Sequence, residues 1–325
     1  MRAAFITATG PASAIVAGEL PVPAPGPADV LVAVETVAVN QVDTYIRSGR
    51  WPTPLPFPFV VGRDLVGTVA RGDAAGIFAP GERVWANSLG YDGRQGACAE
   101  YALVPVDRLY RLPDRADPVV TVASLHPAAT AFISLHHRAH LRAGDTVLVG
   151  GGAGSISACV IQLAVMAGAK VIATARPEDH ERCRRLGVNA VFDYRAQDLP
   201  AHVLSAAPQG VDLHWDTSGH AHLSAAAEMV KPGGRILVTA GREPQPPAPL
   251  WPLYTRDISV IGFVISRATA AELADTARCL NTCLGGSGFA IKVADVLTLD
   301  KTAKAHNVVE SGQRGRIVIR VTPGH

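Results

Sequence analysis

Four glycines gather in one short stretch near the middle of the chain: Gly150, Gly151, Gly152 and Gly154. They follow Thr146–Val149, an apolar run rich in β-branched residues that is typical of a strand buried on both faces. Behind the glycines, apolar residues recur with helical spacing. Glycines let a backbone turn tightly and approach a pyrophosphate, and a helix N-terminus presents free N–H groups and the positive end of its dipole. The stretch therefore predicts a dinucleotide-binding turn.

Contacts to the dinucleotide are expected from the turn and the first helical residues: Gly151, Gly152, Ala153, Gly154, Ser155 and Ile156. One position departs from the usual spacing, because Ser157 stands where a small third residue, usually glycine, lets helix and strand pack closely. Serine is small enough to fit at that position.

The end of the next strand indicates which dinucleotide binds, because an NAD site places a carboxylate on the ribose there. This strand ends with Thr174 and Ala175, Arg176 follows directly, and no carboxylate is present. An arginine can pair with a 2′-phosphate through charge-assisted hydrogen bonds. Arg184 and Arg185, in the following helix, are better explained as a solvated helix face. Thr174 and Arg176 therefore predict NADPH as the cofactor.

Composition indicates a globular protein with an ample core, since 48% of the 325 residues are hydrophobic. The formal net charge of +2 gives no electrostatic reason to expect nucleic acid or a membrane as a partner. Five scattered cysteines fit a reducing compartment better than a disulfide framework. The first residues lack the pattern of a signal peptide, and no apolar run of membrane-spanning length stands out, so we expect a cytoplasmic protein.

Periodicity divides the chain into two kinds of domain. Short alternating runs before residue 110 predict an irregular β domain, with only a possible turn at 42–48. A helix is expected over 117–140, interrupted at His126-Pro127, and another over 269–284. Between them, strands alternating with helices predict a doubly wound parallel sheet: Thr146–Val149, Val171–Ala175, Ala190–Asp193, Val211–Asp216, Arg235–Thr239 and Ile258–Val264. The predicted boundaries are 1–124 for the first part of the β domain, 125–265 for the inserted cofactor domain and 266–325 for the second part.

The segment at 37–49, VAVNQVDTYIRSG, resembles the N-x-x-D-x-x-x-R-x-G segment of the zeta-crystallin-like quinone oxidoreductases, a zinc-free branch of the medium-chain dehydrogenase/reductase superfamily. The resemblance continues in order over nearly the whole chain: LPFPFVVGRDLVGTV (55–69), PGERV (80–84), GACAEY (96–101), PAATAF (127–132), VFDYR (191–195), GVDLHWDTSG (210–219), KPGGRILVTAG (231–241) and AHNVVESGQRGRIVI (305–319). It implies an α/β protein with a GroES-like β-rich catalytic domain and an inserted Rossmann domain.

The resemblance also implies roles for single residues. Asn40 and Tyr45 match residues near the nicotinamide and are the expected catalytic pair, while the remaining matches are expected on the cofactor: Thr130, Tyr194, Gly241, Phe263 and Arg316. Arg316 replaces the more usual lysine of the family's terminal segment, where a contact with the cofactor phosphates is implied. The alternatives are structural: Asn40 capping a turn, Tyr45 as a packing residue and Thr130 bonding backward along its helix.

No metal site is predicted. Alcohol dehydrogenases of the same superfamily hold catalytic zinc with cysteine and histidine, but Asn40 and Arg63 stand at the corresponding positions. His136 and His140 are expected on one helical face, where two ligands without a third are more often a packed or solvated pair. A quinone or a conjugated alkene accepts hydride without a Lewis acid, because the resulting anion is delocalised.

These observations predict an NADPH-dependent, zinc-free reductase of quinones or similar conjugated carbonyl compounds. An enoyl or 2-alkenal reductase, including one that tailors a natural product, remains the alternative within the same class. A noncatalytic NADPH-binding protein with an RNA-binding role is a rival of another class, against which the near-neutral charge argues. Relatives of this kind imply a homodimer.

Overall fold

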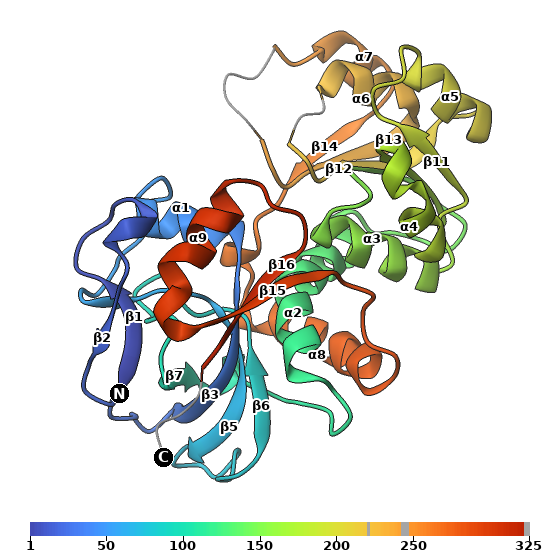
Figure 1. Ribbon diagram of the computed structural model, residues 1–325. Helices are drawn as coiled ribbons and strands as arrows, with labels where there is room; N and C mark the ends of the chain where they lie inside the picture. Colours follow the sequence, from blue (N-terminus) through green and yellow to red (C-terminus); the bar gives the residue numbers. More distant parts are fainter. Residues whose placement is uncertain (220–221, 242–246, 322–325) are drawn as a thin grey trace. The chain divides into compact units, whose positions relative to one another are not determined.

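The computed structural model describes residues 1–219, 222–241 and 247–321. The chain divides into two compact units: unit 1 comprises Met1–His126 and Ala268–His325, and unit 2 comprises Pro127–Arg267. Unit 2 is therefore inserted into unit 1, and each junction lies two residues beyond the boundary expected from the sequence, at 126 rather than 124 and at 267 rather than 265. Figure 1 traces the course of the chain.

Two sheets form unit 1. The smaller sheet has the order β2-β1-β4, and the larger has the order β15-β16-β3-β5-β6-β8, with β7 also pairing with β3. The strands are β1 Arg2–Ile6, β2 Val16–Glu19, β3 Asp29–Val39, β4 Phe59–Val60, β5 Asp64–Arg71, β6 Arg83–Ala86, β7 Tyr101–Pro105, β8 Tyr110–Arg111, β15 Val293–Thr298 and β16 Arg316–Arg320. Because β16 pairs antiparallel with β3 and Ile317 lies opposite Val39, the first residue of β16 lies beside the residue that follows β3.

The helices of unit 1 include two that the sequence did not predict. Helix α1, Gln41–Ser48, was expected only as a possible turn, and the sequence analysis assigned no helix to the residues of α9, Thr302–Glu310. These two helices pack against each other. Helix α8, Ala270–Gly285, agrees with the expected helix, and three 3₁₀ turns complete the unit: η1 Ala12–Ala14, η2 Val106–Arg108 and η6 Leu299–Lys301.

Unit 2 contains a six-stranded sheet whose strands are all parallel, in the order β11-β10-β9-β12-β13-β14. The strands are β9 Thr146–Gly150, β10 Lys170–Ala175, β11 Ala190–Asp193, β12 Val211–Asp216, β13 Val230–Val238 and β14 Ser259–Gly262. The chain runs outward from β9 in one direction and then from β12 in the other, which confirms the predicted doubly wound sheet. Most strand bounds agree with those predicted, although β13 begins earlier, at Val230.

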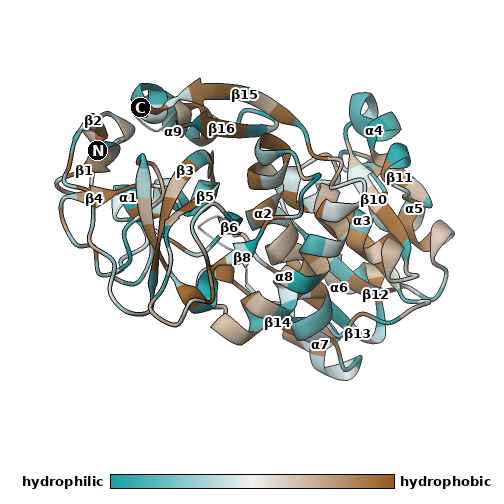
Figure 2. Ribbon diagram, turned by 90° about the horizontal axis from the view of Figure 1, so that it is seen from below, coloured by the Kyte–Doolittle hydropathy of each residue, from teal (hydrophilic) through white to brown (hydrophobic). Residues whose placement is uncertain are grey.

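Helices cover both faces of this sheet (Figure 1). They are α3 Ser155–Met166, α4 His180–Arg185, α5 Leu199–Ala206, α6 Leu223–Met229 and α7 Leu250–Thr255, with 3₁₀ turns η4 Pro177–Asp179 and η5 Ile265–Arg267. One core layer packs Leu148 and Ile172 of the sheet against Val203 of α5 and Ala226 of α6. Figure 2, coloured by hydropathy, shows apolar residues along the strands of this sheet.

The helix expected over 117–140 is continuous through Pro127, so the predicted interruption at His126-Pro127 was wrong. Helix α2 spans Pro118–Phe132 and continues as a π-helical segment, Ile133–Arg138. Pro127 has no N–H to bond the carbonyl of Ala123, four residues earlier. That carbonyl instead accepts a hydrogen bond from Nε of Arg316 at 2.9 Å. A partner distant in the sequence thus satisfies the group that proline leaves unbonded.

The π-helical segment ends before His140, which has a positive φ of 49°, so His136 and His140 do not share a helical face as predicted. The combined helix Pro118–Arg138 is also long and apolar enough, by length and composition, to cross a membrane, with a mean hydropathy of 1.4. The sequence reasoning had found no such span. Because 72% of its most apolar window is buried inside the protein, the helix has the character of a core helix.

Candidate functional site

The glycine turn of unit 2 connects β9 to α3 and is held by the end of the neighbouring strand β10. The N–H of Gly152 donates to the carbonyl of Thr174 at 2.7 Å, and the N–H of Gly151 reaches the Thr174 hydroxyl at 3.4 Å. Gly151 has a φ of 70°, which favours glycine. A Cβ on Gly152 would lie 3.0 Å from the Cβ of Ala173 and 3.2 Å from the sulfur of Cys183. The turn therefore needs glycine for both its backbone conformation and its close approach to β10.

Ser157 stabilises the glycine turn at the position where the usual pattern has a glycine. Its side chain is fully buried, and its hydroxyl donates to the carbonyl of Gly151 at 2.8 Å and lies 2.6 Å from the hydroxyl oxygen of Thr217. Thr217 in turn donates to the carbonyl of Gly150 at 3.1 Å. The hydroxyls of Ser157 and Thr217 thereby hold the backbone carbonyls of the turn in place. Sequence reasoning missed Thr217, although it lies within one of the segments that carry the family resemblance.

The other residues predicted to bind the turn's ligand form its accessible rim. Gly154 is the N-cap of α3, and Ala153, Ser155 and Ile156 are partly exposed beside it. The first N–H groups of an α-helix have no partner within the helix, so those of α3 are available to an anion. This arrangement fits a pyrophosphate.

Two residues predicted at the adenosine phosphate lie at the carboxyl ends of adjacent strands. Arg176 follows β10 and Tyr194 follows β11, and the last residues of those strands are paired in register. The side chain of Arg176 is 38% exposed and forms ion pairs with Glu178 at 3.4 Å and Asp179 at 4.0 Å. Tyr194 is 48% exposed, and the guanidinium of Arg195 lies over its ring. A 2′-phosphate at this edge would compete with Glu178 for Arg176.

Thr130 in α2 is 4% exposed, and its hydroxyl has no hydrogen-bond partner among the described residues. The alternative in which this hydroxyl bonds backward along the helix is therefore absent from the structure. A buried polar atom without a partner is uncommon and fits a group that forms a hydrogen bond with a ligand.

Gly241 and Phe263 also follow the carboxyl ends of strands, after β13 and β14 respectively. The N–H of Phe263 donates to the carbonyl of Val238 at 3.0 Å, and its ring lies under the guanidinium of Arg138. In a doubly wound sheet, ligands bind in the crevice outside the carboxyl ends of the strands. The glycine turn, Thr174, Gly241 and Phe263 all belong to that edge of the unit-2 sheet.

In unit 1, the predicted catalytic residue Asn40 lies within a buried polar cluster, defined here as Asn40, Asp43, Arg63, Asp64 and Arg316. Asn40 is 1% exposed, and its amide nitrogen donates to Oδ2 of Asp64 at 2.9 Å and to Oδ2 of Asp43 at 3.3 Å. Its amide oxygen accepts from Arg316, whose Nε is bonded to Ala123. These bonds hold the amide of Asn40 in place, and its predicted contact with a substrate stays a prediction. Arg316 likewise uses its guanidinium within the polar cluster, so its predicted contact with the cofactor phosphates stays a prediction.

The two carboxyl groups of the polar cluster titrate near neutral pH. Burial raises the pKa of Asp43 to about 6, against the opposing charge of Arg63 and hydrogen bonds from Asn40. Burial, together with the charge of Asp43, raises the pKa of Asp64 to about 7. Burial and the charges of Arg63 and Arg316 hold the pKa of the neighbouring His126 well below its ordinary value. Sequence reasoning assigned no role to Asp64.

The resemblance implies that Asn40 and Arg63 stand at positions where alcohol dehydrogenases hold zinc, and the chemistry of the polar cluster does not fit a zinc ion. Arg63 is 1% exposed, and its Nε donates to the carbonyl of Asn87. Two guanidinium groups beside two carboxyl groups already balance the charge, and they would repel a dication. Among the described residues, no group of three or more His, Cys, Asp or Glu side chains could hold a metal ion.

Tyr45, the other predicted catalytic residue, is partly exposed on α1, and the guanidinium of Arg50 lies 4.7 Å from the centre of its ring. Helix α1 is fixed at its start by Asp43, whose carboxylate accepts from the N–H of Asn40 at 2.8 Å. It is fixed at its other end by the buried Arg47, which pairs with Glu310 of α9. The polar cluster therefore positions the helix that carries Tyr45.

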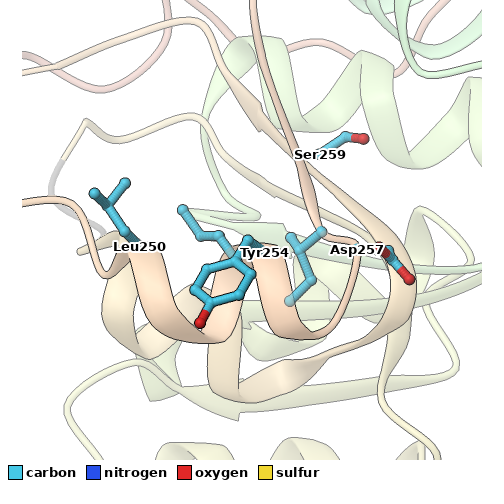
Figure 3. A pocket seen from close by; sticks show the side chains of 6 residues that line it. Leu250, Tyr254, Asp257 and Ser259 are labelled. Atoms are coloured by element: carbon cyan, nitrogen blue, oxygen red, sulfur yellow. The ribbon is translucent and has the colours of Figure 1, made fainter.

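A separate surface hollow in unit 2 is lined by Leu250, Leu253, Tyr254, Asp257, Ile258 and Ser259 (Figure 3). Ser259 is the first residue of β14, so the hollow lies at the amino end of that strand, opposite to the edge that carries the glycine turn. Leu250 and Trp251 are each 71% exposed and Tyr254 is 63% exposed. This hollow is therefore not part of the dinucleotide edge.

Two family models match the chain: an alcohol dehydrogenase GroES-like domain over residues 26–114 and a zinc-binding dehydrogenase domain over residues 155–280. The quinone oxidoreductase of Rattus norvegicus is 30% identical over 315 residues, covering 95% of this chain and 94% of its own length. The trans-enoyl reductase tazE of Aspergillus terreus is 34% identical over 221 residues, covering 63% of this chain and 73% of its own.

Solved structures of related proteins are similar to this chain over nearly its whole length. A structure described as an NAD-dependent alcohol dehydrogenase superposes with a TM-score of 0.89 at 28% identity, covering 99% of this chain and 100% of that one. A mycobacterial protein in complex with NADPH superposes with a TM-score of 0.85 at 26% identity, covering 98% and 99%. With its GroES-like unit, its inserted Rossmann unit and near-complete coverage by such relatives, the chain belongs to the zeta-crystallin-like quinone oxidoreductases of the medium-chain dehydrogenase/reductase superfamily.

Proposed function

We propose that this oxidoreductase uses NADPH to transfer hydride to a quinone or a similar conjugated carbonyl acceptor, without zinc. The observation that carries the proposal is the glycine turn, with Arg176 and Tyr194 at the carboxyl ends of the next two strands. The similarity to the Rattus norvegicus quinone oxidoreductase and to the NADPH-complexed mycobacterial protein supports it.

Bound NADPH would supply the hydride from C4 of its nicotinamide ring. The backbone N–H groups at the start of α3 would hold the pyrophosphate, and Arg176 would pair with the 2′-phosphate. The unpartnered hydroxyl of Thr130 would donate at the nicotinamide end. Tyr45 would donate one hydrogen bond to the carbonyl oxygen of the acceptor, which needs orientation more than strong acid catalysis because the reduced anion is delocalised.

The experiment that tests the acceptor class is a comparison of kcat/KM for 9,10-phenanthrenequinone, a 2-alkenal and an enoyl thioester, each with NADPH. Tyr45→Phe separates the two mechanisms. If Tyr45 only orients a carbonyl, the variant should reduce the quinone about tenfold more slowly or less, near 1.4 kcal/mol. If Tyr45 were the obligate proton donor of an enoyl reductase, the loss should approach about 10²–10⁴-fold.

The trans-enoyl reductase of Aspergillus terreus favours the alternative, a reductase of enoyl or 2-alkenal substrates that could serve a natural-product pathway. A much higher kcat/KM for an enoyl thioester than for any quinone, lost in Tyr45→Phe, would decide for it.

An RNA-binding role is disfavoured by the net charge of +2. A gel-shift assay with RNA, beside the turnover assay, tests that rival. Elemental analysis should find no stoichiometric zinc, and activity should survive EDTA.

We also propose a homodimer formed by two copies of the β14 edge. This strand ends the unit-2 sheet, its residues are largely exposed, and the exposed side chains of α7 lie beside it (Figure 3). An unpaired edge next to an apolar patch suits a self-complementary two-fold contact. Trp251→Glu should convert the dimer to a monomer in light scattering, and a wild-type monomer would refute the assignment.

A cytoplasmic location is proposed from the five free cysteines and is testable by fractionation.

A further inference from the structure

The end of helix α1 fixes the position of Arg50, a residue that the proposed reaction does not use. Gly49 ends the helix with a φ of 77°, and its N–H donates to the carbonyl of Ile46 at 3.1 Å. The N–H of Trp51 donates to the carbonyl of Tyr45 at 3.1 Å. Backbone bonds of this kind commonly end α-helices, because they give partners to carbonyl groups that the helix leaves unbonded. Arg50 lies between the two bonded residues, so its backbone is fixed beside Tyr45.

The side chain of Arg50 lies over the ring of Tyr45. Its guanidinium is 4.7 Å from the centre of that ring, which is within the range of a cation–π contact. The contact gives a long, exposed side chain one preferred position. A ligand whose oxygen reaches the hydroxyl of Tyr45 therefore also comes close to a guanidinium.

Among the residues that the structure describes, no acidic side chain pairs with Arg50. Two other arginines of unit 1 contrast with it: the buried Arg47 pairs with Glu310, and Arg94 lies 3.9 Å from Asp92. A guanidinium presents several N–H donors in a planar fork that matches the oxygens of a carboxylate or a phosphate, and an aromatic ring does not use them. Arg50 is thus a positioned cation that has no counter-ion of its own.

The residue after Arg50 belongs to an aromatic pair. The ring of Trp51 contacts the ring of Tyr91 edge to face, with 5.8 Å between their centres, and both side chains are partly exposed. The N–H of Asp92 donates to the hydroxyl of Thr53 at 3.0 Å, which also links the two loops. Aromatic side chains of this kind suit contact with a flat, conjugated molecule.

We propose that Arg50 is a specificity-determining residue, which forms an ion pair with a carboxylate, sulfonate or phosphate group of the acceptor while Tyr45 bonds the carbonyl oxygen. This role rests on the proposed function, because that function places the acceptor at Tyr45. The acceptor class is thereby narrowed to conjugated carbonyl compounds that carry an anionic group. The ring of Tyr45 already restricts the guanidinium, so less conformational entropy is lost when the ion pair forms.

The test compares 1,4-naphthoquinone-2-sulfonate with 2-methyl-1,4-naphthoquinone, which share a ring system and differ in one substituent. The measured quantity is the ratio of kcat/KM for the sulfonate to kcat/KM for the methyl compound, each with NADPH. Arg50→Gln should lower this ratio about tenfold, an effect between those of an exposed ion pair and a buried charge-assisted hydrogen bond. Arg50→Lys should lower it less, because lysine keeps the charge without the planar fork.

Arg71→Gln is the matched control, because it removes an exposed arginine from the end of β5 in the same unit. This variant should leave the ratio as in wild type. Raising the ionic strength should lower the ratio in wild type more than in Arg50→Gln, since salt screens an exposed ion pair. An equal loss for both quinones in Arg50→Gln would show that Arg50 only supports the ring of Tyr45, and would overturn the proposal.

Equilibrium binding separates this inference from the proposed function. Naphthalene-2-sulfonate has no carbonyl group and accepts no hydride, so calorimetric titration measures its Kd without turnover, in the absence and presence of NADP⁺. The Kd should rise about tenfold in Arg50→Gln and by less than about twofold in Arg71→Gln. If neither quinone were reduced but this difference held, the proposed function would fall and the anion site would stand. A Kd and a ratio that do not depend on Arg50 would remove the site and leave the reductase.

Discussion

The glycine turn of unit 2 and the polar cluster of unit 1 solve the problem of positioning functional groups in opposite ways. The turn is made from contiguous residues, is held by backbone groups and two hydroxyls, and leaves its rim partly exposed. The polar cluster joins side chains from distant segments: three buried charged or chargeable groups and the partly buried Arg316 surround one amide. Adding a side chain to such a turn should weaken cofactor binding, whereas removing a partner from such a cluster should lower the free energy of unfolding.

The largest effect is expected from adding a side chain to the turn. Gly152→Val would force its Cβ against Ala173 and Cys183, displacing the backbone that approaches the pyrophosphate. The Kd for NADPH should rise about 1,000-fold, near 4 kcal/mol, in a fluorescence titration. Gly262→Ala is the matched control, because a Cβ there meets nothing within 4 Å. Equal affinities of the two variants would show that the turn tolerates a side chain.

Removing a partner should destabilise unit 1. Arg316→Ala leaves the carbonyl of Ala123 and the amide oxygen of Asn40 without this donor, and it removes one of the two guanidinium charges beside the buried carboxyl groups. Denaturant unfolding should show a loss of about 3 kcal/mol. Arg320→Ala, at the exposed end of the same strand, should cost less than about 0.5 kcal/mol. A loss in Arg316→Ala no larger than in this control would contradict the role assigned to the polar cluster.

The polar cluster should also make stability depend on pH. The pKa values of Asp43 and Asp64, about 6 and about 7, lie above the ordinary 3.8, so the folded state holds protons that the unfolded state releases. Their contribution is complete below about pH 4 and is lost as the pH rises through 6 to 7. His126, His214 and His306 have lowered pKa values and act in the opposite direction, so the pH dependence of the wild-type protein combines both contributions.

Asp64→Asn isolates the contribution of that carboxyl group. Relative to wild type, the variant should gain about 2 kcal/mol in free energy of unfolding between about pH 5.5 and pH 8, because it never carries the buried charge. Denaturant titrations of both proteins across this range measure the difference. A difference that stays constant with pH would show that Asp64 has an ordinary pKa.

The smallest expected effect concerns the cofactor preference of the turn. Arg176→Ala should raise the KM for NADPH about 10- to 100-fold and leave NADH nearly unchanged, as one lost charge-assisted contact predicts. Glu178→Gln removes the carboxylate that now pairs with Arg176 and should strengthen NADPH binding a few-fold. Equal use of NADH and NADPH by the wild-type enzyme would refute the assignment.

The sequence by itself determined the unit-2 sheet, its glycine turn and the family, because these depend on residues close together in the chain. Strand, turn and helix follow one another between Thr146 and Met166, so period and composition were enough to identify them. The same local patterns could not identify Ser157 and Thr217 as a hydroxyl pair, since those residues meet only when β12 lies beside β9.

Only the tertiary structure decided the polar cluster and the helices around it. Arg316 is separated from Asn40 by 276 residues and reaches it because Ile317 of β16 pairs with Val39 of β3. That register also supplies the donor for the carbonyl of Ala123, which is why α2 continues through Pro127 although the sequence predicted a break. Burial then raises the pKa values of Asp43 and Asp64. None of this is encoded in local periodicity, because each group obtains its partner or its desolvation from a distant segment of the chain.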